Sequence, residues 1–225
     1  MYNVDNNLRR YINGEILPRY DLNKVGGHGR EHIETVIERS FELMREFGLK
    51  LDPNMVYVIA SFHDVGYKAD PENHEEVSSS MFLADSTMST FFSDEQRKII
   101  AEAIVDHRAS LEYEARSEYG KLVSSADREV SVENMLKRSI LFQADKHKDE
   151  HPNKLQIIEY SYQKLSSKYG KGGYAKMYFK DKRYLNFVEH MQELLEDKDK
   201  FITAEMKIIM EMRGSEEVSS FGFLN

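Results

Sequence analysis

Cysteine and tryptophan are absent from the 225-residue sequence, and proline occurs only four times. The absence of cysteine excludes a disulfide scaffold, a zinc ribbon and a cysteine nucleophile, because each of these needs a thiol. Long apolar runs are also absent: the longest, residues 55–62, is much shorter than the ~20 residues that a membrane-spanning helix needs. Residues 1–5 do not resemble the beginning of a secretory signal. We therefore expect a cytoplasmic protein with no membrane partner.

Charge and composition narrow the class of protein further. Asp and Glu total 39 against 31 for Lys and Arg, which gives a formal net charge of −8. This acidic balance argues against binding to nucleic-acid polymers, which favour basic surfaces. Hydrophobic residues make up 40% of the chain, enough to form a core and to argue against wholesale disorder. The length suits one large domain, and we expect residues 1–225 to form it.

The apolar residues recur with helical spacing over most of the chain. In residues 32–47, for example, Ile33, Val36 and Ile37 repeat three and four residues apart on one helix face. No segment alternates apolar and polar residues with a period of two, so we do not expect a sheet. The predicted fold class is all-α, a compact multi-helix bundle. Helices are predicted over residues 32–47, 53–66, 93–107, 118–128, 131–149, 153–169, 182–196 and 198–212.

Several polar residues lie on these apolar faces, where core residues are expected. A single histidine in such a place is usually an ordinary hydrogen-bonded core residue. A buried carboxylate, however, costs several kcal/mol unless a cation or several donors compensate it. A divalent metal held by nitrogen and oxygen donors explains the whole set most simply. The set comprises three histidines and two aspartates, on four predicted helices: His32, His63, Asp64, His107 and Asp127.

The order of these residues resembles that of the HD-domain superfamily of metal-dependent phosphohydrolases. His32 opens a helix, as the first histidine of the family does, and the doublet His63–Asp64 is followed by Gly66. The closing Ala-Asp of the family is matched by Asp127 and the alanine before it. One departure is Thr35, where many members carry Arg. The resemblance covers roughly residues 25–130 and implies an all-α HD-type core.

The resemblance implies a set of metal ligands and catalytic residues. His32, His63, Asp64 and Asp127 are expected to bind the first metal, and His63 and Asp64 are expected to be catalytic. His28 competes with His32, because it lies four residues earlier in a glycine-rich loop. We favour His32 as the ligand and His28 as a pocket residue that binds substrate or supports a ligand.

A second metal is left open by the sequence. His74 and His107 lie between the doublet and Asp127, an order similar to that of members with two metals, and Asp64 would then bridge the ions. One ion is expected, with two as the alternative. Since the donors are imidazole and carboxylate, we expect manganese, iron, cobalt, nickel or zinc rather than magnesium.

The resemblance also implies a function. We expect a phosphohydrolase that cleaves a phosphate ester or anhydride of a nucleotide or similar small molecule, using water activated by the metal. Arg108 and Lys121 are the candidate phosphate-binding cations. Two alternatives stay open: a di-iron oxygenase of the HD type, and a non-catalytic nucleotide-binding module that the metal stabilises. The loop that contains Gly172, Gly173 and Tyr174 either connects two helices or covers the pocket.

The domain organisation follows from these assignments. We expect the HD core with the metal site at residues 22–130, further helices packing on it at residues 131–212, and a loose tail at residues 213–225. The C-terminal helices carry spare apolar residues, which either close the core or form a homodimer interface. These are Met135, Leu136, Phe142, Ile202, Met206 and Met210.

Overall fold

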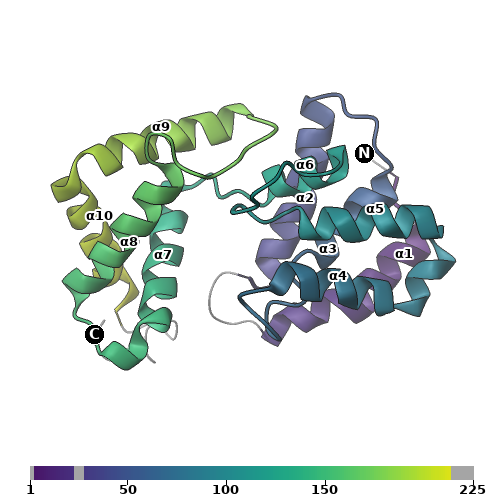
Figure 1. The fold of residues 1–225 in the computed structure, drawn as a ribbon, viewed down its shortest axis with the longest axis horizontal. Helices are drawn as coiled ribbons and strands as arrows, with labels where there is room; N and C mark the ends of the chain where they lie inside the picture. The colour runs from purple at the N-terminus through teal and green to yellow at the C-terminus, as the bar shows by residue number, and fades with distance from the viewer. Residues whose placement is uncertain (1–2, 23–27, 214–225) are drawn as a thin grey trace. The chain divides into compact units, whose positions relative to one another are not determined.

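The computed structural model describes residues 3–22 and 28–213 (Figure 1). Over these residues the chain forms ten α-helices and no β-strand, so the predicted all-α fold class is confirmed. None of the described helices is both long enough and apolar enough to cross a membrane. The predicted tail, from residue 214 onward, lies outside the described residues.

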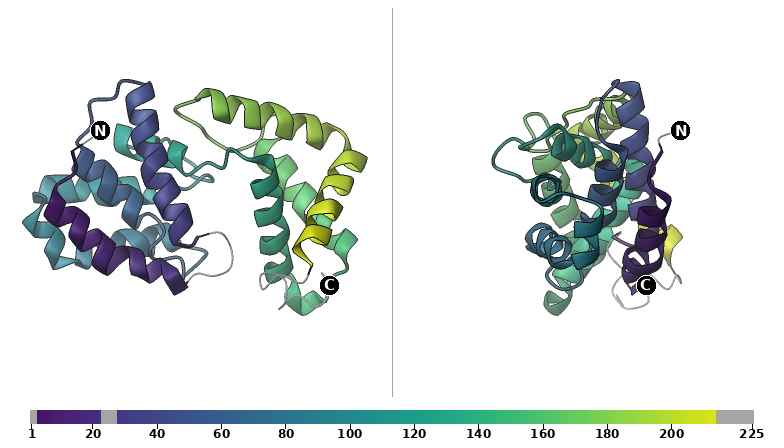
Figure 2. Two further views of the ribbon diagram at one scale, coloured as in Figure 1. Left: turned by 180° about the vertical axis from the view of Figure 1, so that it is seen from behind. Right: turned by 90° about the vertical axis from the view of Figure 1, so that its right-hand side faces the viewer.

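The chain divides into two compact units, and the first contains the predicted metal ligands. Unit 1 comprises the chain up to Arg128 together with a separate segment, Lys176–Asp181. Its elements are α1 (Asn6–Tyr11), a π-helical turn η1 (Ile12–Ile16), a 3-10 turn η2 (Leu17–Leu22), α2 (Arg30–Glu46), α3 (Pro53–Phe62), α4 (His74–Ala84), a 3-10 turn η3 (Ser86–Thr90), α5 (Asp94–Val105) and α6 (Glu118–Ala126). In Figure 2 (left) the N-terminal helical segment lies on the side of this unit that faces the viewer.

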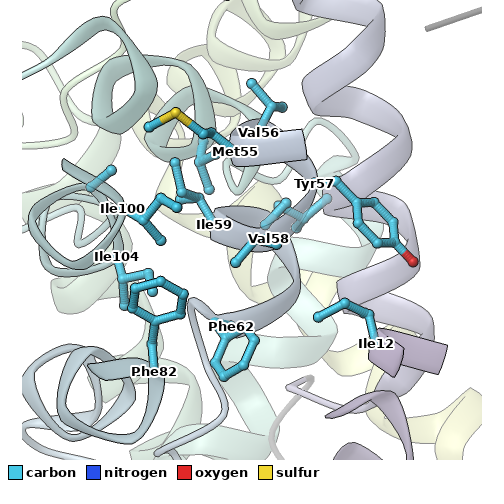
Figure 3. Packing of buried hydrophobic residues seen from close by; sticks show 14 of the residues in the cluster. Ile12, Met55, Val56, Tyr57, Val58, Ile59, Phe62, Phe82, Ile100 and Ile104 are labelled. Carbon is cyan, nitrogen blue, oxygen red and sulfur yellow. The ribbon is translucent and has the colours of Figure 1, made fainter. Parts of the chain in front are cut away.

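Helix α3 is the centre of unit 1. Pro53 occupies its first turn and Asp52 caps it by accepting a hydrogen bond from the Asn54 backbone nitrogen. All residues from 55 to 62 are buried. Figure 3 shows the side chains of α3 packed among those of α4, α5 and η1. Each large apolar side chain buried in this way stabilises the fold by about 1.5–3 kcal/mol. The carboxyl end of α3 therefore lies in the middle of the unit.

Helix α3 ends four residues earlier than the sequence predicts. It stops at Phe62, and residues 63–69 form tight turns, such as the one in which the Tyr67 nitrogen donates to the Asp64 carbonyl oxygen at 3.0 Å. The apolar spacing continues to Val65, and for this reason the sequence predicts a helix as far as Gly66. The other predicted helices agree with the structure within three residues at either end.

Gly66 allows α4 to approach the end of α3 closely. A Cβ atom at this position would lie 2.7 Å from the Ser78 backbone nitrogen and 2.8 Å from the Val77 Cβ atom. The Gly66 nitrogen also donates a hydrogen bond to the Ser78 hydroxyl oxygen at 2.9 Å. Only a residue without a Cβ atom fits here. Because Gly66 has none, the first turn of α4 can lie next to the His63–Asp64 doublet.

Unit 2 consists of the remaining helices. They are α7 (Val132–Lys146), a 3-10 turn η4 (Lys148–Glu150), α8 (Lys154–Tyr169), α9 (Lys182–Glu196) and α10 (Lys198–Met212). Among the spare apolar residues, Met135 and Leu136 are buried within this unit, whereas Phe142 is 45% exposed and Met210 is 58% exposed. The packing of residues 131–212 on the HD core stays a prediction.

One charged residue lies in the core of unit 2. Glu205 on α10 is fully buried, and one of its carboxylate oxygens accepts a hydrogen bond from the Ser161 hydroxyl at 2.5 Å. The second oxygen has no hydrogen-bond partner. Burial raises the pKa of Glu205 to about 9, because a charged carboxylate is poorly solvated there. The residue is therefore protonated at neutral pH.

Candidate metal centre

The His63–Asp64 doublet lies directly after α3, and both side chains are buried. The Nδ1 atom of His63 lies 2.8 Å from the Ala60 carbonyl oxygen, a distance at which Nδ1–H donates a hydrogen bond. In the neutral imidazole, the form that binds a metal, the other ring nitrogen, Nε2, then carries the lone pair. It is buried and has no hydrogen-bond partner. This is the arrangement of a histidine that is ready to bind a metal.

Three side chains from three parts of unit 1 meet around this nitrogen. The ligand atoms of His32, His63 and Asp127 all lie within 4.8 Å of one another. His32 comes from the first turn of α2 and Asp127 is the residue that ends α6. The His32 Nε2 atom lies 3.1 Å from Asp127 Oδ1, and the His63 Nε2 atom lies 3.8 Å from the same oxygen. We call these three residues the first group.

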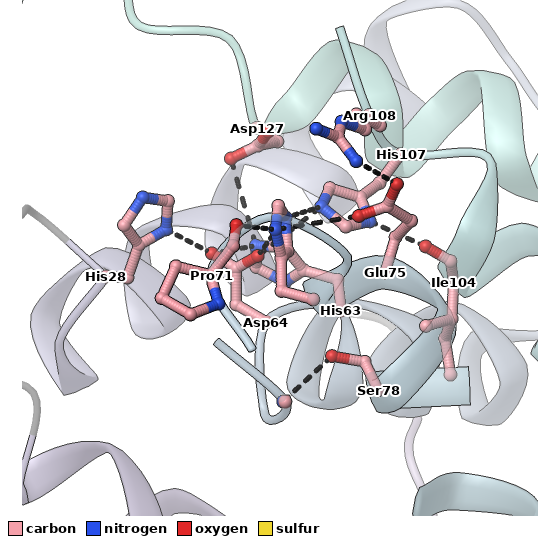
Figure 4. Close-up of polar contacts among 12 residues, drawn as sticks. His28, His63, Asp64, Pro71, Glu75, Ser78, Ile104, His107, Arg108 and Asp127 are labelled. Atoms are coloured by element: carbon pink, nitrogen blue, oxygen red, sulfur yellow. Dashed lines mark hydrogen bonds and ion pairs between the residues drawn. The ribbon is translucent and has the colours of Figure 1, made fainter. Parts of the chain in front are cut away.

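A second group lies on the other side of the doublet. It consists of Asp64, His74 and His107, again with ligand atoms within 4.8 Å of one another. The Nε2 atoms of both histidines lie 3.3 Å from Asp64 Oδ1. Asp64 follows the end of α3, His74 begins α4 and His107 follows α5. Figure 4 shows Asp64 and His107 close to each other in this centre.

The two histidines of the second group face each other in a way that favours a cation. The Nδ1 atom of His74 lies 3.1 Å from the Pro71 carbonyl oxygen, and that of His107 lies 2.5 Å from the Ile104 carbonyl oxygen. Both Nε2 atoms then carry lone pairs, and they are 3.2 Å apart. Two donors that each lie about 2.1 Å from one ion are roughly 3.0–3.4 Å apart in octahedral or tetrahedral geometry. The spacing therefore fits two ligands of one metal.

Asp64 belongs to both arrangements. Its Oδ2 atom lies 3.3 Å from His63 Nε2 and 3.7 Å from His32 Nε2, while its Oδ1 atom faces the second group. The Oδ1 atom is buried without a hydrogen-bond partner. Because its two oxygens face different groups, this carboxylate has the placement that a bridging ligand needs. That it bridges two ions stays a prediction.

His28 reaches the same carboxylate from the loop before α2. Its Nδ1 atom lies 2.6 Å from Asp64 Oδ2, and its ring stacks on Tyr67 with 3.9 Å between ring centres. The ligand atoms of His28, His32 and Asp64 also lie within 4.8 Å of one another. The structure thus brings both competing histidines to the site. It also adds Tyr67, which no sequence pattern selects.

Residues 29–130 match the HD domain family. This segment is an HD domain. The predicted resemblance to the HD-domain superfamily is confirmed for this segment, which contains both groups and spans less than half of the chain. Neither the curated proteins nor the solved structures gave a match to the chain.

Electrostatics in the HD domain depend on the shared carboxylate. Burial alone would lower the pKa of His63, but the negative charge of Asp64, whose Oδ2 atom lies 3.3 Å from His63 Nε2, outweighs burial and raises the pKa to about 9. Burial acts to raise the pKa of Asp64, yet the positive charges of His63 and His28 hold it well below its usual range. The protein without metal thus keeps a protonated imidazole beside a carboxylate. A metal ion takes the place of such protons when it binds.

The pKa values of the other candidate ligands, Asp127 and His74, are shifted by burial and by neighbouring groups in the same way. The hydrogen bond and charge of His32 outweigh burial and lower the pKa of Asp127. Burial lowers the pKa of His74, and the neighbouring His107 adds to this effect, so His74 stays neutral at physiological pH. Neutral imidazoles and ionised carboxylates are the forms that bind metals. The residues therefore fit a divalent ion held by nitrogen and oxygen.

Arg128 is a buried residue that connects the two groups. Its guanidinium donates to Asp127 Oδ2 at 3.2 Å and to the His107 carbonyl oxygen at 3.0 Å. It also donates to the Ser124 hydroxyl oxygen at 2.8 Å and to the Lys176 carbonyl oxygen at 3.3 Å. The sequence shows only that Arg128 comes after Asp127. A buried arginine with these partners fixes the orientation of one predicted ligand and the backbone of another.

The two predicted phosphate-binding cations are engaged by the protein's own groups. Arg108 donates to Glu75 and, at 2.7 Å, to the Glu72 carbonyl oxygen. The Lys121 ammonium lies 3.7 Å from a carboxylate oxygen of Glu114 and 5.6 Å from the centre of the Tyr178 ring. To bind a phosphate, each would exchange or share these partners. Their role in substrate binding stays a prediction.

Proposed function

We propose that this protein is a metal-dependent phosphohydrolase that cleaves a phosphate ester or anhydride of a nucleotide or similar small molecule. The main support is the geometry of Asp64, a buried carboxylate whose two oxygens face His63 on one side and His74 with His107 on the other. The HD domain at residues 29–130 supports the hydrolase class. Oxygen and nitrogen donors at these distances suit one or two transition-metal ions.

A bound divalent ion would supply a water of lowered pKa and a Lewis acid for the phosphate oxygens. The chain's own residues would hold and orient the reacting groups. His63, His74 and His107 are oriented by hydrogen bonds from Nδ1 to backbone carbonyls, so their Nε2 atoms keep one direction. Asp64 or Asp127 would accept the proton that the attacking water gives up. Fixed donors of this kind lower the reorganisation that the reaction requires.

The substrate that we propose is small and anionic. The net charge of −8 repels nucleic-acid polymers, while metal ions at the two groups would attract a single phosphate locally. Arg108 and Lys121 would complete the phosphate site by exchanging their carboxylate partners for substrate oxygens. Lys121 is one-third exposed, and a surface ion pair of this length contributes little stability, so the exchange costs little free energy.

The test is a screen of substrates against metals. Nucleoside mono-, di- and triphosphates, dinucleoside polyphosphates and simple phosphate esters are each incubated with manganese, iron, cobalt, nickel, zinc or magnesium, and phosphate release is measured. We expect turnover with at least one transition metal, and its loss in Asp64→Ala. Asp94→Ala is the matched control, because the side chain of Asp94 is fully exposed at the start of α5. Equal turnover in metal-free Asp64→Ala protein contradicts the proposal.

The same screen separates the two alternative functions. Oxygen uptake with iron, without phosphate release, would identify an oxygenase. Tight nucleotide binding without turnover under every metal would identify a binding module. Both outcomes keep the two groups as metal ligands and reject the proposed reaction.

A further inference from the structure

A short segment far along the chain belongs to unit 1. Residues Lys176–Asp181 lie in sequence between α8 and α9, both of which belong to unit 2, yet they pack within unit 1. We call residues 176–181 the strap. Family membership gives no reason to expect it, because the HD domain match ends at residue 130.

One side of the strap is attached to α6. The Ser125 hydroxyl oxygen accepts hydrogen bonds from the backbone nitrogens of Tyr178 and Phe179, both at 3.2 Å. Ser125 is fully buried and lies two residues before Asp127. The Lys176 carbonyl oxygen accepts a further hydrogen bond from Arg128. The strap is therefore bonded to the residues on either side of Asp127.

The other side of the strap is attached to α2. Arg39 and Asp181 form two hydrogen bonds of 3.1 Å each, the two-pronged geometry that guanidinium and carboxylate groups favour. Both residues are buried, with exposures of 4% and 2%. A buried pair tolerates little displacement, because separating the charges leaves both without solvent. Arg39 lies seven residues, about two helical turns, after His32 and so on the same face of α2.

Helices α2 and α6 carry the two ligands of the first group that come from outside the doublet. We propose that the strap positions this group: by holding α2 through Asp181 and α6 through Ser125, it fixes the 3.1 Å spacing between His32 and Asp127. The inference rests on the proposed metal site. It makes Arg39, Ser125 and Asp181 positioning residues for the first metal.

The second group gives an internal comparison within the same molecule. Its ligands lie at the end of α3, the start of α4 and the segment after α5, whereas Arg39 and Ser125 hold the strap from α2 and α6. The strap also reaches the segment after α5, where the Lys176 ammonium donates to the carbonyl oxygens of Leu111 and Tyr113. Changes at Asp181 or Ser125 leave those donor and acceptor groups in place, so they should weaken the first site more than the second. A general loss of stability would not produce this asymmetry.

The experiment uses three full-length variants. Asp181→Asn removes the charge that pairs with Arg39, and Ser125→Ala removes the acceptor of the two strap nitrogens. Tyr11→Phe is the control, because it removes a different tertiary hydrogen bond of unit 1, the one of 2.7 Å to Asp85. Calorimetric titration with Mn²⁺ and the visible spectrum of the Co²⁺-loaded protein report the two sites. We expect one site to bind about 10–100-fold more weakly in both test variants and neither site to change in the control.

A second readout needs no metal. Imidazole nitrogen resonances of the metal-free protein should shift for His32 in Asp181→Asn and in Ser125→Ala, while those of His74 keep their wild-type values. Folded variants with unchanged resonances and unchanged metal affinities overturn the inference, as do variants in which both groups change equally. If Asp181→Asn does not fold, Ser125→Ala introduces no unpaired charge and decides alone. Failure of the phosphate-release screen would reject the proposed reaction without altering either readout.

Discussion

The histidines of the centre are oriented in two different ways. His63, His74 and His107 each donate from Nδ1 to the backbone carbonyl three residues earlier, so the local chain sets their direction. His32 and Asp127, by contrast, lie on two helices that are distant in sequence, α2 and α6, and their ligand atoms come within 3.1 Å of each other only because those helices pack together. Locally oriented ligands depend on a single turn, whereas the other two depend on the packing of unit 1. The first group contains both residues that depend on packing, so it should be more sensitive than the second group to a disturbance of the packing of unit 1.

The largest effect on metal binding is expected at Asp64, whose two carboxylate oxygens face the two groups. Asp64→Ala removes the only carboxylate of the second group and the carboxylate oxygen that lies 3.3 Å from His63 of the first group, so we expect neither metal to bind with measurable affinity. Metal content after dialysis, measured by elemental analysis, checks this. Retention of one full equivalent of metal would show that the carboxylate serves only one group.

Gly66→Ala should weaken metal binding at the second group only. The added Cβ would lie 2.7 Å from the Ser78 backbone nitrogen, and because backbone cannot rotate away, α4 must move and take His74 with it. We expect unfolding to become easier by about 1–3 kcal/mol, with weaker binding at one metal site only. Denaturant titration and Mn²⁺ calorimetry measure the two effects. Gly14→Ala is the control, since nothing lies within 4 Å of a Cβ atom there.

The stability of the metal-free protein should fall both at acidic and at alkaline pH. Asp64 and Asp127 have lowered pKa values, so their contribution is present above the ordinary value of 3.8 and is lost as the pH falls. His63 has a pKa raised from 6.5 to about 9, so its contribution is present below 6.5 and is lost as the pH rises through 9.

Metal should remove the alkaline limb of this profile, because a metal-bound imidazole needs no proton. Thermal unfolding between pH 4 and pH 10, with and without Mn²⁺ or Co²⁺, measures the difference. An identical alkaline limb in both series would mean that His63 is not a ligand.

The smallest effect on the centre is expected from unit 2. The pKa of Glu205 is raised from 4.5 to about 9, so the folded state binds a proton that the unfolded state releases, and stability falls as the pH rises between these values. Glu205→Gln should remove this slope, which is at most about 1.4 kcal/mol per pH unit, and leave metal binding unchanged. Thermal unfolding at pH 5 and pH 8 measures the slope. A variant with the wild-type slope contradicts the assignment.

The sequence predicts those features that local patterns determine. Apolar spacing predicts eight of the helices, and the placement of His63 and His107 on inner faces comes from the same spacing. The spacing does not predict helix α4, because its run of three serines weakens the apolar stripe. The ambiguity between His28 and His32 remains, since both reach Asp64.

Tertiary contacts account for the features that the sequence could not predict. Arg39 and Asp181 are 142 positions apart, and neither lies in a motif that marks it as half of a buried pair. The need for glycine at position 66 follows from the clash that a Cβ atom there would make with α4, and only the packed structure reveals this. In the sequence Arg128 has no feature that separates it from other arginines. In the fold it is buried and donates hydrogen bonds to Asp127 and to the His107 carbonyl oxygen. Each of these depends on chain segments that meet only after folding.

The strap also affects how the protein can be divided or recombined. Because residues 176–181 return to unit 1, the chain passes between the units at three places: after Arg128, before Lys176 and after Asp181. A fragment cut at the family boundary, residue 130, would lack a segment that pairs with Arg39 in its interior. Exchange of the C-terminal helices for those of another protein therefore requires three junctions rather than one, and this HD domain can be transplanted intact only if the strap is carried along with it.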